Sequence, residues 1–277
     1  MDTFYIIISG AAIILKSRNE FMKFFIIPDK NNIKKSLELA EEYNAGFEYN
    51  DFFMPDFLDD SDAVKRVEEM YLKERLPAEC TFHGAFLDVT VHSDDKRIRE
   101  IADLRINQSL DIAKKMSAKS VIFHTNYISN FLLESYRKSW VERNAEYWSQ
   151  KLSQYENLNI FIENMFDSDS ELLAALGERM KDNPRFGICF DYAHATIFGS
   201  DIDSWVKTLA PFVKHIHIND NDLISDQHKP VGDGKIDWNV FLSYYRKYFS
   251  SVPVLIEVNG TDGQRISLQY LDKLMKQ

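Results

Sequence analysis

A regular alternation of two kinds of segment, running from Met22 to the C-terminus, constrains the fold of this chain most strongly. Short runs rich in β-branched and aromatic residues alternate with longer segments whose apolar residues recur at helical spacing. This alternation is typical of repeated βα units. Eight strands are predicted: Lys23 to Pro28, Gly46 to Tyr49, Glu79 to His83, Ser120 to His124, Asn159 to Glu163, Phe186 to Asp191, Val213 to Asn219 and Val252 to Glu257. Eight helices are predicted between and after them: Asn32 to Tyr43, Asp60 to Arg75, Asp95 to Lys115, Ser135 to Tyr155, Ser168 to Met180, Ile202 to Leu209, Asp237 to Tyr248 and Thr261 to Met275.

The number and size of these units predict a closed barrel. Eight consecutive βα units in about 250 residues match its usual length. An open doubly wound sheet would need a glycine-rich phosphate loop after its first strand, whereas the residues there read IIPDKNN. Ser168 precedes an acidic first turn, and Asp237 is placed to cap the helix that starts at Trp238. We therefore expect an α/β chain with a single domain, a (β/α)8 or TIM barrel, over residues 22–277.

Residues 1–21 do not fit this pattern and form an N-terminal extension whose place in the natural protein the sequence leaves open. Phe4 to Leu15 is an apolar run that is too short to span a bilayer. Because Asp2 rather than a basic segment precedes it, a signal peptide is not expected. Met22 is a second methionine at which the domain could begin.

The net charge and the cysteine content limit which binding partners and which cellular compartment the sequence favours. The 33 Lys and Arg residues against 43 Asp and Glu residues give a net charge of −10, which disfavours a nucleic-acid partner. Cys80 and Cys189 lie in apolar strand-like runs, as core residues do, and do not form a disulfide framework. A reducing cytoplasm is the expected compartment, with no membrane contact. Homo-oligomerisation is compatible with the sequence.

Metal-competent side chains fall at the ends of six of the eight predicted strands. They are His83, His124, Glu163, Asp191, His217 and Glu257. The C-terminal ends of parallel barrel strands form one rim, where groups far apart in sequence converge. A single strand-terminal histidine is more often a hydrogen-bonded rim residue than a metal ligand. Several carboxylates and imidazoles packed together without a cation would, however, lower the stability of the fold. The sequence therefore predicts a metal site at the barrel mouth.

Further candidates lie in the loops and deeper in the barrel. Asp191 and His194 are three residues apart in FDYAHA, and Asp226 and His228 lie two apart in a loop that could fold over the mouth. His215 shares a strand face with His217 by the period of two, so we expect it to be an interior residue one layer deeper. His92, in the polar loop VTVHSDD, is expected to be exposed.

The segments GICFDYAHATIFG, HIHINDND, DQHKPVGDGKIDW and LIEVNG resemble those of the xylose isomerase-like barrel superfamily, and the resemblance runs from about Met22 to the end. This superfamily contains sugar and sugar-phosphate isomerases and epimerases, inosose-processing enzymes and the endonuclease IV type of DNA repair nuclease. The resemblance implies that Glu163, Asp191, His217 and Glu257 bind a shared divalent metal. It also implies that five further residues match the positions that complete a three-zinc cluster in the nuclease branch: His83, His124, His194, Asp226 and His228.

Two chemistries follow from such a site. In the first, a divalent ion (Zn, Mn, Mg or Co) polarises a sugar carbonyl, and Glu163 and Glu257 move the adjacent proton through an enediolate. His194, His83 and His124 would then bind substrate oxygens of a small carbohydrate. The second is phosphodiester hydrolysis at a multinuclear zinc centre in which Glu163 bridges two ions.

The loop after the second strand favours the sugar chemistry. It reads NDFFMPDFLDDSDA, with five aspartates and no basic residue, whereas a nuclease must grip several phosphates. Phenylalanine and acid in a loop suit a lid over a small polar ligand, although an amphipathic connector would look the same. A third alternative, a structural metal in a binding module, fits poorly because structural zinc sites are closed and usually cysteine-rich.

Overall fold

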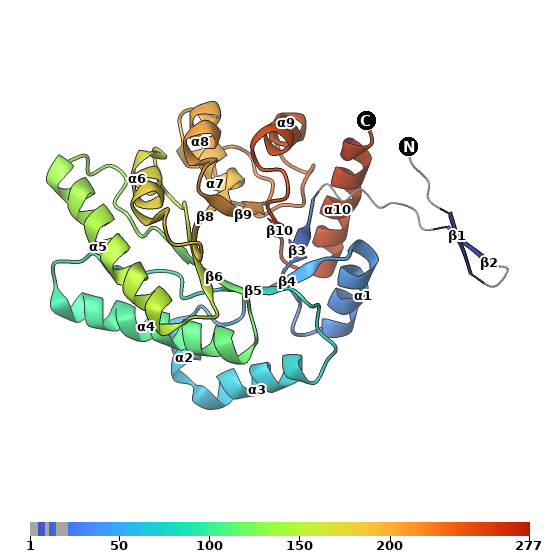
Figure 1. Ribbon diagram of the computed structural model, residues 1–277, viewed down its shortest axis with the longest axis horizontal. Helices are drawn as coiled ribbons and strands as arrows, with labels where there is room; N and C mark the ends of the chain where they lie inside the picture. The colour runs from blue at the N-terminus through green and yellow to red at the C-terminus, as the bar shows by residue number, and fades with distance from the viewer. Residues whose placement is uncertain (1–4, 9–10, 15–21) are drawn as a thin grey trace.

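The computed structural model describes residues 5–8, 11–14 and 22–277, and its centre is a closed barrel of eight parallel strands (Figure 1). The strands follow each other around the barrel in chain order, and the last, β10, closes the ring by pairing with the first, β3. Their bounds are β3 (Phe24–Ile26), β4 (Gly46–Tyr49), β5 (Cys80–His83), β6 (Ser120–His124), β7 (Asn159–Glu163), β8 (Phe186–Asp191), β9 (Val213–Ile218) and β10 (Val254–Ile256). The predicted (β/α)8 barrel is confirmed.

Helices connect the strands and surround the barrel (Figure 1). Eight of them correspond to predicted helices: α1 (Ile33–Tyr43), α3 (Ser61–Leu72), α4 (Lys96–Lys115), α5 (Glu134–Gln154), α6 (Glu171–Met180), α8 (Ile202–Leu209), α9 (Trp238–Tyr248) and α10 (Thr261–Met275). Two short helices, α2 (Pro55–Asp59) and α7 (Tyr192–Phe198), were not predicted. Both follow the end of a strand directly or within a few residues, where the sequence suggested only loop.

Several predicted boundaries were wrong by a few residues, and the helix expected to begin at Ser168 is the clearest case. The helix begins at Glu171, and the hydroxyl of Ser168 instead donates a hydrogen bond to the carbonyl of Ser129. The Asp169 carboxylate accepts a hydrogen bond from the backbone N–H of Glu171 at 3.1 Å, so Asp169 rather than Ser168 satisfies a free N–H group in the first turn of α6. Asp237 does cap α9 as predicted, because its carboxylate accepts from the N–H groups of Asn239 and Val240.

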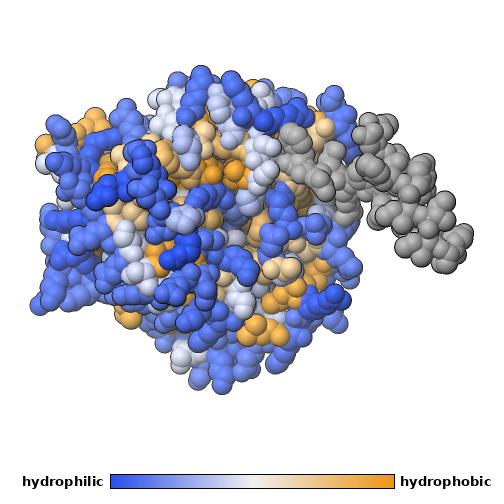
Figure 2. All heavy atoms as spheres, viewed as in Figure 1, coloured by the Kyte–Doolittle hydropathy of each residue, from blue (hydrophilic) through white to orange (hydrophobic). Residues whose placement is uncertain are grey.

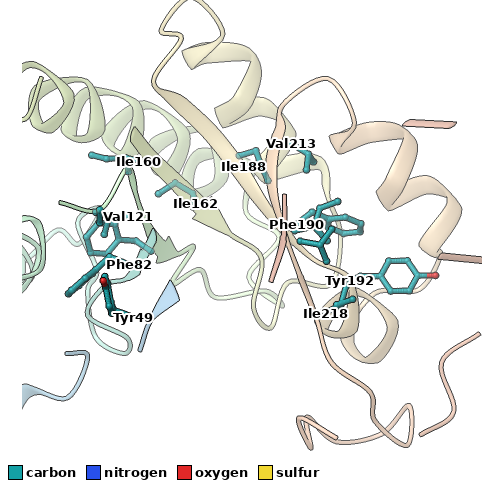
Figure 3. Packing of buried hydrophobic residues seen from close by; sticks show 14 of the residues in the cluster. Tyr49, Phe82, Val121, Ile160, Ile162, Ile188, Phe190, Tyr192, Val213 and Ile218 are labelled. Atoms are coloured by element: carbon teal, nitrogen blue, oxygen red, sulfur yellow. The ribbon is translucent and has the colours of Figure 1, made fainter. Parts of the chain in front are cut away.

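The strand side chains divide into two layers by their alternation. Residues of one parity pack outward against the helices, and Figure 3 labels members of this layer such as Val121, Ile162 and Phe190. Residues of the other parity point into the barrel, where Ile122, Phe161 and Cys189 form a separate apolar cluster. The inward residues at the strand ends are therefore held on a rigid, fully packed frame.

Two short strands, β1 (Tyr5–Ile8) and β2 (Ala11–Ile14), form an antiparallel pair apart from the barrel (Figure 1). The prediction that residues 1–21 are an extension stays a prediction, since most of that segment lies outside the described residues. Hydrophilic side chains cover most of the face seen in Figure 2, with small apolar patches between them. Among the described helices, none has the length and hydropathy needed to cross a membrane.

The prediction that His92 is exposed was wrong. Its side chain is buried beside Trp140, its Nε2 lies 3.3 Å from the Tyr136 hydroxyl, and its carbonyl accepts from Arg143. Burial, aided by the charge of Arg143, lowers the pKa of His92 to about 4. The polar residues next to His92 in the sequence do not indicate this burial, because the aromatic residues that cover it, Tyr136 and Trp140, belong to α5, some 45 positions further along.

Acidification should therefore destabilise the fold through His92. Its pKa is lower in the folded than in the unfolded chain, so the unfolded chain binds the extra proton as the pH falls below about 6.5. Between pH 7 and pH 5 this group should remove roughly 2 kcal/mol from the free energy of unfolding. Urea denaturation at both pH values should show a smaller loss for His92→Gln than for the unsubstituted protein. Equal losses would contradict this assignment.

Candidate metal centre

Four of the predicted ligands lie on the four neighbouring strands β7 to β10. Glu163 and Asp191 end β7 and β8, His217 is the penultimate residue of β9, and Glu257 directly follows β10. Asp191 and His217 are partners in the strand register, so their side chains stand at the same height. One ligand atom from each of the four lies within 4.8 Å of the others. We call this group the four-residue cluster.

A second cluster shares Glu163 with the first. His83 and His124 end β5 and β6, and their Nε2 atoms lie 3.9 and 3.5 Å from Oε2 of Glu163. Phe86 lies edge-on to the His124 ring with centroids 4.8 Å apart, and Phe53 contacts Phe86 in turn at 6.1 Å. Two aromatic side chains from two loops therefore form a wall beside these histidines.

A third cluster joins His194, from α7, with Asp226 and His228, from the loop between β9 and α9. Oδ2 of Asp226 lies 3.3 Å from Nε2 of His194 and 2.9 Å from Nε2 of His228. The loop thus places its two candidate ligands at the mouth, as the sequence suggested. All nine candidate ligands named from the sequence fall in these three clusters.

Buried Asp220 holds this loop in place. Its carboxylate accepts hydrogen bonds from the backbone N–H groups of Gly232 and Ile236 and from Nε1 of Trp238, at 2.8 to 3.2 Å. Its backbone also forms a bridge with Lys229, immediately after His228. Asp220 is thus the anchor that positions the third cluster.

Replacing Asp220 should lower the free energy of unfolding. Asp220→Ala leaves the buried donors of Ile236 and Trp238 without their acceptor, at about 1–3 kcal/mol each, so we expect a loss of roughly 3–5 kcal/mol. Urea denaturation measures the effect, and Asp233→Ala, an exposed aspartate in the same loop, is the matched control. A loss below about 1 kcal/mol for Asp220→Ala would contradict the proposed anchoring.

The second nitrogen of three histidines lies against a backbone carbonyl. Nδ1 of His83, His194 and His228 lies 2.9 to 3.1 Å from the carbonyls of Gly84, Asn164 and Glu257, respectively. A carbonyl only accepts, so each Nδ1 must carry its proton and donate it. The Nε2 atoms are thereby directed at the carboxylates of the clusters, which is how metal-binding histidines are usually fixed.

The charges of the site are strongly coupled. Burial opposes ionisation of Glu163, yet His217 and His124 hold the pKa of Glu163 below its ordinary value. Burial also opposes ionisation of Glu257, but His228 and His217 hold the pKa of Glu257 well below its ordinary value. Burial raises the pKa of Asp191 well above its usual range. Burial also disfavours the charged form of His228, but Glu257 and Asp226 outweigh it and raise its pKa to about 10. The pKa values of His217 and His228 are raised, so protons on these two imidazoles supply positive charge that a metal ion would replace.

Buried atoms without hydrogen-bond partners test whether a metal fits. Within the described part of the chain, both carboxylate oxygens of Glu163, Oδ2 of Asp191, Nδ1 of His217 and Oε2 of Glu257 have none. The other oxygen of Asp191 caps α7 by accepting from the N–H of His194 at 2.6 Å. Buried polar groups are rarely left without partners, and these face one another. Three carboxylates and one imidazole suit Zn²⁺ or Mn²⁺, so the residues fit a divalent ion.

Sequence reasoning missed Glu48, which lies inside the barrel on β4. Its carboxylate is 3.0 Å from Nε2 of His217 and 3.0 Å from Nε2 of His215, and it accepts a 2.7 Å hydrogen bond from Thr81. His215 is interior, as predicted, between the rings of Phe25 and Phe161. Strand alternation could have identified Glu48, because it is a charged residue between the aromatic Phe47 and Tyr49 and so must face the opposite side.

The loop predicted as a lid, residues 50–63, contains α2 and is mostly a packed connector. Phe52 and Leu58 are buried, and Phe52 stacks on Phe82 of β5. Phe53 alone among its phenylalanines reaches the aromatic wall beside the second cluster. The loop therefore contributes one side chain near the mouth rather than a complete cover.

The fold and these clusters define the class: a (β/α)8 barrel with a candidate divalent-metal centre at the C-terminal ends of its strands. The chain belongs to the xylose isomerase-like TIM barrel family, whose model matches residues 37–274. Among curated proteins, an uncharacterized protein of Methanocaldococcus jannaschii (MJ1311) is 25% identical over 178 residues, which cover 61% of this chain and 60% of that protein. A probable endonuclease 4 of Protochlamydia amoebophila is 37% identical over 86 residues, 26% of this chain and 30% of that protein.

Solved structures share the fold over nearly the whole chain. A D-tagatose 3-epimerase-like protein superposes with a TM-score of 0.71 at 22% identity, covering 92% of this chain and 97% of its own. The IOLI protein, in a structure with a bound zinc atom, superposes with a TM-score of 0.64 at 18% identity, covering 92% and 95%. At these identities the likeness concerns the fold.

Proposed function

We propose that the protein is a metal-dependent isomerase or epimerase of a sugar or sugar phosphate, acting by proton transfer through an enediolate. The observation that carries this proposal is that two buried carboxylates, Glu163 and Glu257, belong to the same four-residue cluster at the end of the barrel. Proton removal beside a carbonyl and its return at a neighbouring atom need two such groups at one substrate.

Glu163, Asp191, His217 and Glu257 would hold the divalent ion, which when bound polarises the substrate carbonyl and its neighbouring hydroxyl. Glu163 and Glu257 each have a carboxylate oxygen without a hydrogen-bond partner in the described structure, so each can bind or release a proton. One, in its ionised form, would remove the proton next to the carbonyl, and the other, carrying a proton taken from solvent, would deliver that proton to the enediolate. His194, His83 and His124 would hold substrate oxygens, and the wall of Phe53 and Phe86 would pack on the sugar face.

Charge at the mouth supports a small substrate over a polyanion. Lys30, in the first βα loop, pairs with Asp51 at 3.1 Å, and Arg137 pairs with Asp169 at 3.0 Å. Arg265, near the start of α10, pairs with Glu42. These three cations are paired with local acids, which leaves less positive charge for binding several phosphates.

Hydrogen exchange at carbon tests the proposal. The metal-loaded protein, incubated with a panel of ketoses in D₂O, should incorporate deuterium next to the carbonyl of at least one sugar, detected by NMR. Glu68→Gln, which changes a buried glutamate on α3 that pairs with Lys115, is the control and should retain exchange. Absence of exchange across ketoses and ketose phosphates would overturn the proposal.

A second candidate, a multinuclear zinc phosphodiesterase cleaving abasic-site DNA, is favoured by one observation. Nine ligand-type residues form three adjoining clusters, two of which share Glu163, and this number exceeds what one ion needs. The partial match to a probable endonuclease 4 supports the same candidate. Near three zinc ions per chain, cleavage of an abasic-site duplex and loss of that cleavage in His228→Asn would establish it over the isomerase.

A further inference from the structure

His217 differs from His83, His194 and His228 in what its second nitrogen faces. Nδ1 of His217 lies 3.2 Å from Glu163 and 3.5 Å from Glu257, so this nitrogen points into the four-residue cluster. Its Nε2, on the other side of the ring, lies deeper in the barrel, 3.0 Å from Oε1 of Glu48, a charge contact that does not meet hydrogen-bond geometry in the described structure. His83, His194 and His228 each have a neutral carbonyl at the corresponding place. Among these four, His217 has the closest carboxylate behind its ring, at 3.0 Å, whereas Nδ1 of His194 lies 3.6 Å from the nearest one, Asp191, and against a carbonyl.

Glu48 is itself held from several sides. It is fully buried, and its second oxygen accepts from the Thr81 hydroxyl at 2.7 Å and lies 3.0 Å from Nε2 of His215. Thr81 is its partner in the register of β4 and β5, and His215 shares a strand face with His217. His215 is in turn fixed between Phe25 and Phe161. Residues from β4, β5 and β9 thus place one carboxylate directly beneath the metal cluster.

Burying a carboxylate in the interior of a barrel lowers the stability of the fold unless hydrogen bonds or opposite charges compensate for its lost hydration. Ile122, Phe161 and Cys189 form an apolar cluster in this interior, whereas the contacts of Glu48 are the polar Thr81, His215 and His217. A carboxylate behind a metal-binding histidine, in contrast, fixes the ring tautomer and makes the other nitrogen a stronger ligand. The geometry therefore gives this costly residue a role at the site.

We propose that Glu48 is a positioning residue that holds His217 with the proton on Nε2, so that Nδ1 presents its lone pair to the divalent ion. Thr81 and His215 orient the carboxylate of Glu48 for this purpose. The inference rests on the metal cluster proposed above but not on the reaction, because it concerns metal affinity and the state of one histidine ring.

Zinc titration with a competing chelator tests the proposal on the full chain. Glu48→Gln keeps the shape of the side chain but removes its charge, and it should weaken zinc binding about 10- to 100-fold. Thr81→Val leaves the carboxylate but removes its hydroxyl donor, and it should weaken binding by a smaller factor. Glu68→Gln, a buried glutamate remote from the mouth, is the matched control and should bind zinc as the unsubstituted protein does.

Long-range ¹H–¹⁵N NMR of the histidine rings provides the readout that a merely structural role would not change. His217 in the zinc-loaded protein should carry its proton on Nε2. Affinities of Glu48→Gln and Thr81→Val within about threefold of the control would overturn the role of Glu48 alone, as would a proton on Nδ1 of His217. If Glu48→Gln does not fold, Thr81→Val and the NMR spectrum decide. Failure of the unsubstituted protein to bind zinc would overturn the metal cluster as well, whereas intact zinc binding without ketose exchange would count only against the isomerase.

Discussion

Glu163→Gln should lower turnover by about 10³-fold or more and reduce the bound metal. Glu163 belongs both to the four-residue cluster and to the cluster with His83 and His124, so its loss removes a ligand from each. It is also one of the two proposed proton carriers, and such groups contribute about 10²- to 10⁴-fold. Metal content by mass spectrometry and the rate of substrate conversion are the measurements.

The control for this substitution is Glu68→Gln, which removes a buried carboxylate from α3 instead of from the barrel mouth. It should retain both metal and turnover. Full metal content together with full activity in Glu163→Gln would contradict the assignment of Glu163 to the site.

Glu257→Gln should lower turnover about 10³-fold while leaving most of the metal in place. Glu163, Asp191 and His217 remain as ligands, and a glutamine oxygen can still occupy the fourth position weakly. The proton-transfer role, however, requires a carboxylate. At saturating zinc or manganese, kcat should fall about 10³-fold with metal occupancy near that of the unsubstituted protein.

The contrast between the two variants is the informative part. If Glu257→Gln keeps full activity at saturating metal, Glu257 is not in the mechanism. If it loses metal as completely as Glu163→Gln, its part is ligation, and the proposed division of roles is wrong.

The barrel could be predicted from sequence because its signals are local. The strand Ser120–His124 and the helix Ile202–Leu209 were predicted to the residue, since apolar runs and helical spacing lie within each segment. Parallel strands in a closed barrel then bring their last residues to one rim, so the sequence alone predicts that His124, Glu163 and Asp191 lie together.

Other features depend on contacts between distant segments, which no local pattern contains. His92 is buried by Trp140 and Tyr136 from another helix, although its own neighbours are polar. Asp220 fixes the loop carrying Asp226 through donors up to 18 residues away. Glu48 lies within β4 rather than at a strand end, and its contact with His217 of β9 arises only when the barrel closes.

An anomalous-scattering crystal structure of the zinc-loaded protein tests the central claim most directly. We expect an anomalous peak about 2.0–2.2 Å from one carboxylate oxygen each of Glu163, Asp191 and Glu257 and from Nδ1 of His217. No peak at this position in crystals that contain excess zinc would contradict the claim that these four strand ends share one ion.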